Sequence, residues 1–186
     1  VKLPTIENSM INRLIHSAVA YLRRGGSPVQ LTIDYTSTQF VFKWKAPSTS
    51  TLVFNWGDGT STSVAGNDST LVTTKSSYSG SGTYNLRIHG DVLDLTWIDI
   101  SGQAFVSGDV SGWSKLIDLT YIDCGATSVS GDVSGWSVLT SLVQLRCYNT
   151  SVSGDVSGWS ALTSLTYLRC KSTSVSGDIS GWSTLT

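Results

Sequence analysis

A block of nine residues recurs four times in the second half of the chain. The block Val-Ser-Gly-Asp-Val-Ser-Gly-Trp-Ser begins at Val106, Val129 and Val152, and a fourth copy from Val175 differs only by Ile179. Successive copies start 23 residues apart. A fixed period of this length predicts that each repeat is one structural unit, which buries its apolar side chains only by stacking on its neighbours. We expect the Ser-Gly-Asp segments to form the corners of these stacked coils.

Apolar residues at a second fixed spacing lie between these blocks. The complete copies are Leu116-x-x-Leu119-x-x-Ile122-x-Cys124, Leu139-x-x-Leu142-x-x-Leu145-x-Cys147 and Leu162-x-x-Leu165-x-x-Leu168-x-Cys170. A copy from Leu95 to Ile100 has one extra residue before its Ser-Gly-Asp. This pattern resembles leucine-rich-repeat proteins. The expected fold is therefore mainly β: an N-terminal α-helix, a small antiparallel β-sandwich, and then a leucine-rich-repeat parallel β solenoid over residues 93–186.

Two repeat positions depart from the pattern of that family. Thr127, Thr150 and Thr173 stand where the family usually has an Asn ladder, and we expect their hydroxyls to bond loop backbone. Tryptophans stand near a position usually held by Leu, and they are Trp113, Trp136, Trp159 and Trp182. Four Trp at one coil register indicate core packing, with an exposed strip that stacks on sugars as the alternative.

Two further ladders follow from the same period. Cys124, Cys147 and Cys170 share one inward position, which predicts a stack of buried thiols, with a disulfide between neighbours as the alternative. Four aspartates also share a position, and they are Asp109, Asp132, Asp155 and Asp178. We expect a solvated turn column there, because like charges one strand spacing apart repel by only ~1 kcal/mol in water. Bridging by calcium is the alternative.

The first half of the chain divides into a helical and an all-β part. Apolar residues at three- and four-residue spacing predict a helix over residues 5–24, within a docking or oligomerisation segment of residues 1–26. Residues 27–92 show alternating apolar runs at 29–33, 40–44, 52–54 and 84–88, separated by turn residues. The run Trp56-Gly57-Asp58-Gly59-Thr60 and the later run from Tyr78 to Ile88 resemble the PKD-type immunoglobulin-like sandwich. A side chain that closes a tight turn is the expected role of Asp58.

Outward strand positions of the solenoid form a candidate binding face. Three columns of varied side chains lie there. The first column is Trp97, Tyr121, Gln144 and Tyr167, and the second is Asp99, Asp123, Arg146 and Arg169. The third column is Ser101, Gly125, Tyr148 and Lys171. These residues vary between copies, whereas the flanking core positions hardly change. The face is expected to be acidic near the sandwich and basic toward the C-terminus. Aromatic platforms with hydrogen-bonding neighbours suit a glycan or a protein partner, and ordinary cross-strand surface pairs are the alternative.

Composition narrows the class of function. With 12 Lys and Arg against 13 Asp and Glu, the chain has no basic surplus for nucleic acid, and no apolar run approaches a membrane span. His16 and His89 have no nucleophile or metal motif near them, so we expect no catalysis, no metal site and no cofactor. The sequence stops at Leu185-Thr186, where a further strand is expected, which predicts more repeats or a cap beyond it.

Two functional hypotheses follow from this combination. Sandwich-plus-repeat chains look like surface proteins of gut bacteria and virion-surface proteins of their phages. The first hypothesis is a non-catalytic adhesion or recognition protein, extracellular or on a cell surface, that binds a glycan or protein. The second is a structural virion protein, a phage head fibre or capsid decoration, which docks on capsid or other virion proteins or forms a homo-oligomer through residues 5–24.

Overall fold

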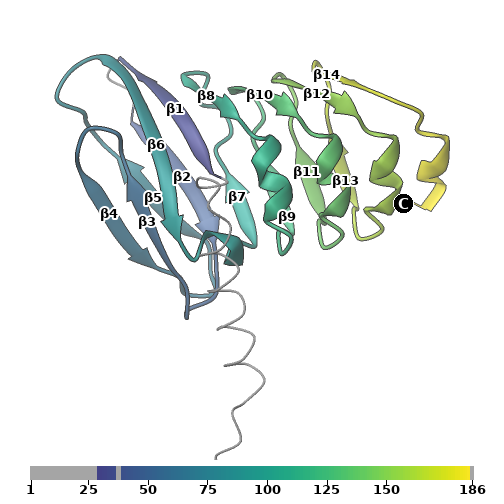
Figure 1. Cartoon of the computed structure of the whole chain (residues 1–186), viewed down its shortest axis with the longest axis horizontal. Helices are drawn as coiled ribbons and strands as arrows, with labels where there is room; N and C mark the ends of the chain where they lie inside the picture. The colour runs from purple at the N-terminus through teal and green to yellow at the C-terminus, as the bar shows by residue number, and fades with distance from the viewer. Residues whose placement is uncertain (1–28, 37–38, 185–186) are drawn as a thin grey trace, which may run out of the picture.

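The computed structural model describes residues 29–36 and 39–184, and the helix predicted over residues 5–24 lies outside them. The described chain is mainly β and forms two sheets (Figure 1). One sheet has eight strands in the order β14-β12-β10-β8-β1-β6-β3-β4, and the other has six in the order β13-β11-β9-β7-β2-β5. Each sheet therefore contains strands from both halves of the chain.

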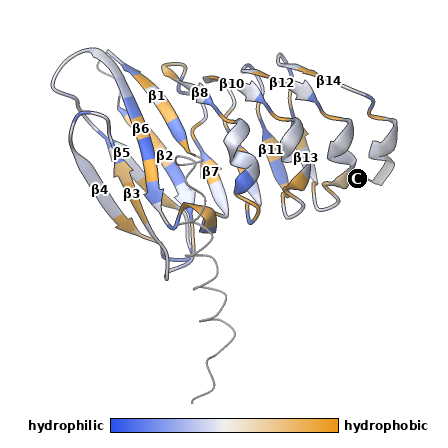
Figure 2. Cartoon of the chain, viewed as in Figure 1, coloured by the Kyte–Doolittle hydropathy of each residue, from blue (hydrophilic) through white to orange (hydrophobic). Residues whose placement is uncertain are grey.

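Six antiparallel strands come from the first half of the chain. They are β1 (Gln30–Tyr35), β2 (Phe40–Lys45), β3 (Thr51–Asn55), β4 (Ser61–Ala65), β5 (Leu71–Lys75) and β6 (Gly82–Gly90). Alternation of apolar and polar residues predicted β1, β2, β3 and β6, and Figure 2 shows this alternation clearly along β6. Alternation is weak in β4 and β5, which were not predicted. The assignment to a PKD-like sandwich stays a prediction.

Aromatic side chains fill the space between these two sheets. Phe42 and Trp44 of β2 pack against Phe54 of β3, with ring centroids 5.6 and 6.1 Å apart. The Trp44 indole N–H donates to the Thr73 hydroxyl at 2.8 Å, so this buried polar group is satisfied. The alternate residues of β2 face outward, and they are Val41, Lys43 and Lys45.

Asp58 closes the turn between β3 and β4, as predicted. Its Oδ1 accepts the Thr60 N–H at 2.9 Å, and its Oδ2 lies 2.6 Å from Lys75 Nζ. The same ammonium lies 5.9 and 5.0 Å from the ring centroids of Trp56 and Tyr78. Burial opposes ionisation of this carboxyl, but the hydrogen bonds from Lys75 and Thr60 outweigh it and lower the pKa of Asp58 to about 2.

This shift predicts an acid-sensitive contribution to stability. The pKa of Asp58 is lower in the folded chain than the value of about 3.9 expected when unfolded, so its contribution of about 2 kcal/mol is present above pH ~4. The contribution is lost as the pH falls from about 4 to 2. Urea denaturation across this range measures it, and Asp58→Asn should remove this part of the pH dependence. Lys75→Gln should weaken it, whereas an unchanged pH dependence in Asp58→Asn would contradict the assignment.

Each repeat forms one coil with the same three parts. The strands of the six-stranded sheet are β7 (Trp97–Asp99), β9 (Tyr121–Asp123), β11 (Gln144–Arg146) and β13 (Tyr167–Arg169). Those of the eight-stranded sheet are β8 (Val106–Asp109), β10 (Ser128–Asp132), β12 (Ser151–Asp155) and β14 (Ser174–Ser176). Short 3₁₀ helices complete the coils: η2 (Ser111–Lys115), η3 (Ser134–Val138), η4 (Ser157–Ala161) and η5 (Ser180–Thr184), preceded by η1 (Val92–Asp94). Within each sheet the strands of successive coils pair in parallel.

The Ser-Gly-Asp segments belong to strands in the first three blocks, so their prediction as coil corners is wrong. Gly131 and Gly154 have positive φ, and a methyl group on either would overlap the aspartate carboxylate of the preceding coil, Asp109 or Asp132. Each aspartate of the column accepts the N–H of the serine two residues later, at 2.8 to 2.9 Å. Hydrogen bonds from the hydroxyl and N–H groups of these serines lower the pKa of Asp132 and of its equivalents in the later coils. Glycine therefore makes room for a carboxylate that fixes the chain entering the 3₁₀ helix.

The tryptophans form a stack inside the coils, as predicted. Trp113, Trp136 and Trp159 are fully buried, with successive ring centroids 6.2 and 6.4 Å apart. The indole N–H groups of Trp136 and Trp159 donate to the carbonyl oxygens of Val110 and Val133. An exposed sugar-stacking strip is therefore excluded for these three rings.

The cysteine and threonine positions also follow the prediction. Cys124 and Cys147 are fully buried and Cys170 is half-buried, and all three are free thiols. Burial raises the pKa of Cys124 and Cys147, so both thiols stay protonated near neutral pH. The hydroxyls of Thr127 and Thr150 donate to the Cys124 and Cys147 carbonyl oxygens, each at 2.6 Å. Threonine thus closes the loop after the strand with one local hydrogen bond.

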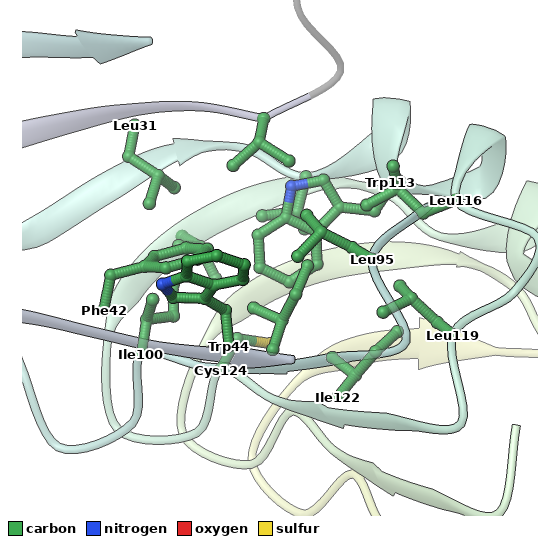
Figure 3. Packing of buried hydrophobic residues seen from close by; sticks show 14 of the residues in the cluster. Leu31, Phe42, Trp44, Leu95, Ile100, Trp113, Leu116, Leu119, Ile122 and Cys124 are labelled. Atoms are coloured by element: carbon green, nitrogen blue, oxygen red, sulfur yellow. The ribbon is translucent and has the colours of Figure 1, made fainter. Parts of the chain in front are cut away.

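The first-half sheets cover the first coil through both of its strands. In the six-stranded sheet β2 pairs with β7, antiparallel. In the other sheet β1 pairs with β8, also antiparallel. Phe42 and Trp44 consequently share one core with Trp113, Leu119 and Ile122 (Figure 3). The boundary proposed at residues 92 and 93 stays a prediction, and both sheets and the core continue across it.

Candidate recognition face

The outward side of the six-stranded sheet carries the predicted binding residues, and we call it the recognition face. Trp97 and Gln144 both pair with Tyr121, and Tyr167 pairs with Gln144, so these four form one row across the strands. The second row is Asp99, Asp123, Arg146 and Arg169, as expected. Tyr148 and Lys171 follow two residues after the last residues of β11 and β13. The register of the repeat therefore brings the predicted residues together on one surface.

Aromatic rings and guanidinium groups stack along this face. The Trp97 and Tyr121 rings are 4.5 Å apart and nearly parallel, at 14°. The Arg146 guanidinium carbon lies 5.5 Å from the Tyr121 ring centroid and 4.7 Å from that of Tyr167. Strands about 4.8 Å apart place equivalent side chains at stacking distance, and a guanidinium over a ring is attracted by its π-electrons. The repeat period thus produces a continuous stack of flat groups.

Hydrogen bonds fix Arg146 in this stack. Its Nη1 donates to the Tyr121 hydroxyl at 3.0 Å and lies 3.5 Å from Asp123 Oδ2, and its Nη2 donates to Gln144 Oε1 at 3.2 Å. Burial and the Asp123 charge raise the pKa of Tyr121 to about 12, so its phenol is neutral at ordinary pH. These contacts therefore hold the Arg146 side chain in one orientation.

The two aspartates of the face are covered rather than open. Asp99 and Asp123 are only 8% and 6% exposed. Asp99 Oδ2 lies 3.1 Å from Lys43 Nζ, and Asp123 Oδ1 accepts the Gly125 N–H at 3.0 Å. Burial, together with the Asp99 charge, raises the pKa of Asp123 against the opposing hydrogen bonds. The aspartates that the sequence places near the sandwich are therefore buried and paired with Lys43 and Arg146.

The exposed side chains of the face belong to β13 and the loop that follows it. Tyr167 is 42% exposed, and Arg169 and Lys171 are also exposed. The Arg169 guanidinium carbon lies 3.8 Å from the Tyr148 ring centroid, which holds that cation flat against the surface. The Tyr148 ring in turn lies over Gly125, where a methyl group would overlap it. This part of the face therefore combines accessible aromatic area with two cations.

Sequence reasoning missed the part of the face that comes from the first half of the chain. Lys43 and Lys45 of β2 pair with Asp99 and Trp97 of β7, so the face continues onto β2. Beyond β2, Val72 of β5 pairs with Lys43 and is 59% exposed. Alternation along β2 indicated that its lysines face outward, but no local signal shows that β2 pairs with β7.

The described part of the chain offers no candidate metal centre. Residues 29–36 and 39–184 contain no group of three or more His, Cys, Asp or Glu that could hold a metal ion. The aspartates of the column are therefore not gathered into such a group, and bridging by calcium has no support in the described residues. His89 is exposed near the end of β6, and His16 lies outside the described residues. Over the same ranges, no helix is both long and apolar enough to cross a membrane.

The parallel rungs, the 23-residue period and one 3₁₀ helix per coil decide the type of repeat. The coils have leucine-rich-repeat geometry. No protein-family profile and no curated protein matches the chain. Several solved structures match part of the chain, and three of them are described next.

Two of these structures are bacterial and one is from a plant. Internalin C2 from Listeria monocytogenes is 27% identical over 41% of this chain and 33% of its own, with a TM-score of 0.35. A second internalin of that bacterium is 25% identical over 42% and 23%, with a TM-score of 0.36. The plant peptide hormone receptor RGFR1, in complex with RGF2, is 25% identical over 39% and 12%, with a TM-score of 0.33. The chain thus spans a third or less of each of these proteins.

Proposed function

We propose that this chain is a non-catalytic, surface-exposed recognition protein that binds a protein partner through the recognition face. The observation that carries the proposal is the group formed by the exposed Tyr167, Arg169 and Lys171 together with the half-buried Tyr148. Tyrosine and arginine are enriched among the residues that dominate binding energy at protein interfaces. A row of such residues on a sheet surface offers a large contact area to a flat partner.

The charges of this group define the chemistry of the partner. Arg169 and Lys171 are exposed cations, whereas Asp99 and Asp123 are covered and paired within the chain. A partner surface that carries carboxylates therefore complements this group, because guanidinium groups bind carboxylates in a planar, bidentate way. An acidic protein patch fits this description better than a neutral glycan.

Preorganisation supports the same proposal. Arg146 is held by Tyr121, Gln144 and Asp123, and Arg169 is held against Tyr148. Side chains that are already ordered lose less conformational entropy on binding, which otherwise costs about 0.5–1.5 kcal/mol for each immobilised side chain. The face therefore offers its cations at a reduced entropic cost.

The location of this activity follows from the resemblance stated above. We place the recognition face outside a cell or on the surface of a virion. Docking or oligomerisation through residues 5–24 concerns a segment outside the described residues, and the recognition face does not depend on it.

A paired substitution tests the function. The chain is immobilised and screened against displayed surface proteins and against a glycan array, and each binder is then purified and its Kd measured. Tyr167→Ala with Arg169→Ala is expected to weaken binding of the protein partner at least 100-fold, because two central side chains of the interface are removed. Both side chains are exposed, so the melting temperature should stay unchanged.

Lys115→Ala provides a matched control, because it removes an exposed cation that lies on η2, away from the recognition face. It should leave the affinity for the protein partner unchanged. If a protein partner binds the double variant as tightly as the original chain, the recognition face is not its binding site. Retention of glycans alone, with that binding lost in the double variant but kept in Lys115→Ala, would replace the protein partner with a carbohydrate.

A further inference from the structure

A polar cleft of about 530 Å³ opens where the first-half sheets meet the first coil. β1 and β6 form its floor, and β8 with η2 forms its wall. The side chains that matter are Gln30, Thr32, Asn85, Arg87, Asp109 and Lys115. Those of β1 and β6 alternate with the buried Leu31 and Leu86, so the cleft faces outward from the eight-stranded sheet. It therefore lies on the side of the molecule opposite to the recognition face.

The cleft exists because the two halves of the chain join with a step. β1 pairs with β6 along its whole length, but with β8 only through Thr32 and Ile33. The 3₁₀ helices stack on one another from η2 to η5, and η2 is the first of that row (Figure 1). The coils thus carry a helical layer that ends beside the bare surface of β1 and β6. This step occurs once in the described chain, at the join, and is not repeated between coils.

Hydrogen-bonding groups line the floor in two opposed pairs. Thr32 stands opposite Asn85, and Gln30 stands opposite Arg87. The Thr32 hydroxyl donates to Asn85 Oδ1 at 3.3 Å. This bond uses the oxygen of the Asn85 amide, so the amide N–H groups point to the other side. The floor therefore presents amide donors and a guanidinium to anything in the cleft.

The wall adds a second cation and one acceptor. Lys115 ends η2, whereas Val138 and Ala161 hold the equivalent positions of η3 and η4. Among these three positions, the cation occurs only in the coil that borders the cleft. Asp109 Oδ1 accepts the Ser111 N–H at 2.8 Å, which leaves Oδ2 to accept from a ligand hydroxyl. Two cations against one carboxylate give the cleft a positive balance.

We propose that this cleft binds a saccharide unit that carries a carboxylate. Arg87 and Lys115 pair with the carboxylate by charge-assisted hydrogen bonds. The Asn85 amide donates to sugar oxygens, and Asp109 accepts from a sugar hydroxyl. A volume of about 530 Å³ lies in the usual range for a small-molecule site. This site shares no residue with the recognition face, so either can fail without the other.

Titration with acidic oligosaccharides tests the site. The probes are oligosaccharides that contain glucuronate, galacturonate or N-acetylneuraminate, each compared with its methyl ester. Saturable binding is expected for at least one acid, with the NMR signals of the Gln30 and Asn85 side-chain amides shifting. The matching methyl ester should bind at least tenfold more weakly, because it lacks the negative charge. Arg87→Gln and Lys115→Gln should each weaken binding by about tenfold.

Controls separate this site from a general attraction between charges. Lys171→Gln removes a cation from the recognition face and should leave the saccharide affinity unchanged. Arg87 and Lys115 are both exposed, so their variants should keep the melting temperature of the original chain. The proposal is overturned if no acid of the panel binds saturably, if an ester binds as well as its acid, or if the shifts map to the recognition face. Inorganic sulfate binding as tightly as the saccharides would also overturn it.

Discussion

Replacing Trp136 by alanine is expected to lower the free energy of unfolding by about 3–5 kcal/mol. The ring is fully buried between Trp113 and Trp159, and its N–H donates to the Val110 carbonyl oxygen at 3.3 Å. Alanine leaves a cavity in the middle of the stack and removes contacts with both neighbouring coils. Urea denaturation followed by circular dichroism measures the loss.

Two further variants show whether the position in the stack matters. Trp136→Phe keeps an aromatic ring but loses the indole hydrogen bond, so its cost should be smaller than that of Trp136→Ala. Trp182→Ala changes the same repeat position in the last described coil, where the ring is only half-buried and stacks on Trp159. Its cost should also be smaller. Equal losses at both tryptophans, or a loss below about 1 kcal/mol at Trp136, would show that the stack does not hold the coils together.

Gly154→Ala is expected to destabilise the chain by about 2–5 kcal/mol. Its φ of 119° costs an L-residue about 1–2 kcal/mol. The added methyl group would overlap the Asp132 carboxylate and lie 3.1 Å from the Ser134 nitrogen, and such overpacking adds about 1–3 kcal/mol. Thermal and urea unfolding of the variant measure the sum.

A double-mutant cycle separates these two causes. Asp132→Ala removes the overlapping carboxylate, so the cost of Gly154→Ala should be smaller in that background. Gly102→Ala serves as the control, because its φ of 74° is also positive but a methyl group there meets no atom within 4 Å. It should lose only the conformational cost of about 1–2 kcal/mol. Additive costs at Gly154 and Asp132 would contradict the proposed contact between coils.

The sequence predicted those parts of the fold that depend on a local period. Alternation located β2 and β6, and the repeat aligned Tyr121 with Gln144 and Tyr167 in the correct register. The inward positions of Cys124 and Trp136 followed from the same period, because one coil repeats the environment of the next. Such features need no knowledge of contacts between distant segments.

The remaining features depend on contacts between distant segments or between coils. Nothing local to Lys43 shows that it meets Asp99, 56 positions away in the chain, or that this contact helps to cover a carboxylate. Glycine and aspartate are poor strand formers, which made Ser-Gly-Asp look like a corner. In the structure Gly131 is required by the carboxylate of Asp109 in the preceding coil, a constraint that appears only after stacking.

The junction of β1 with β8 and of β2 with β7 is made once, whereas every later coil presents to the next the same edge that it received. If a whole 23-residue unit beyond that junction were duplicated or lost, the strand pairing between neighbouring coils would consequently stay the same. Genetic recombination would therefore change the length of this protein in steps of 23 residues, and the pairing of β1 with β8 and of β2 with β7 would not have to change. The polar cleft beside that junction would be preserved through such changes, while the recognition face would become longer or shorter.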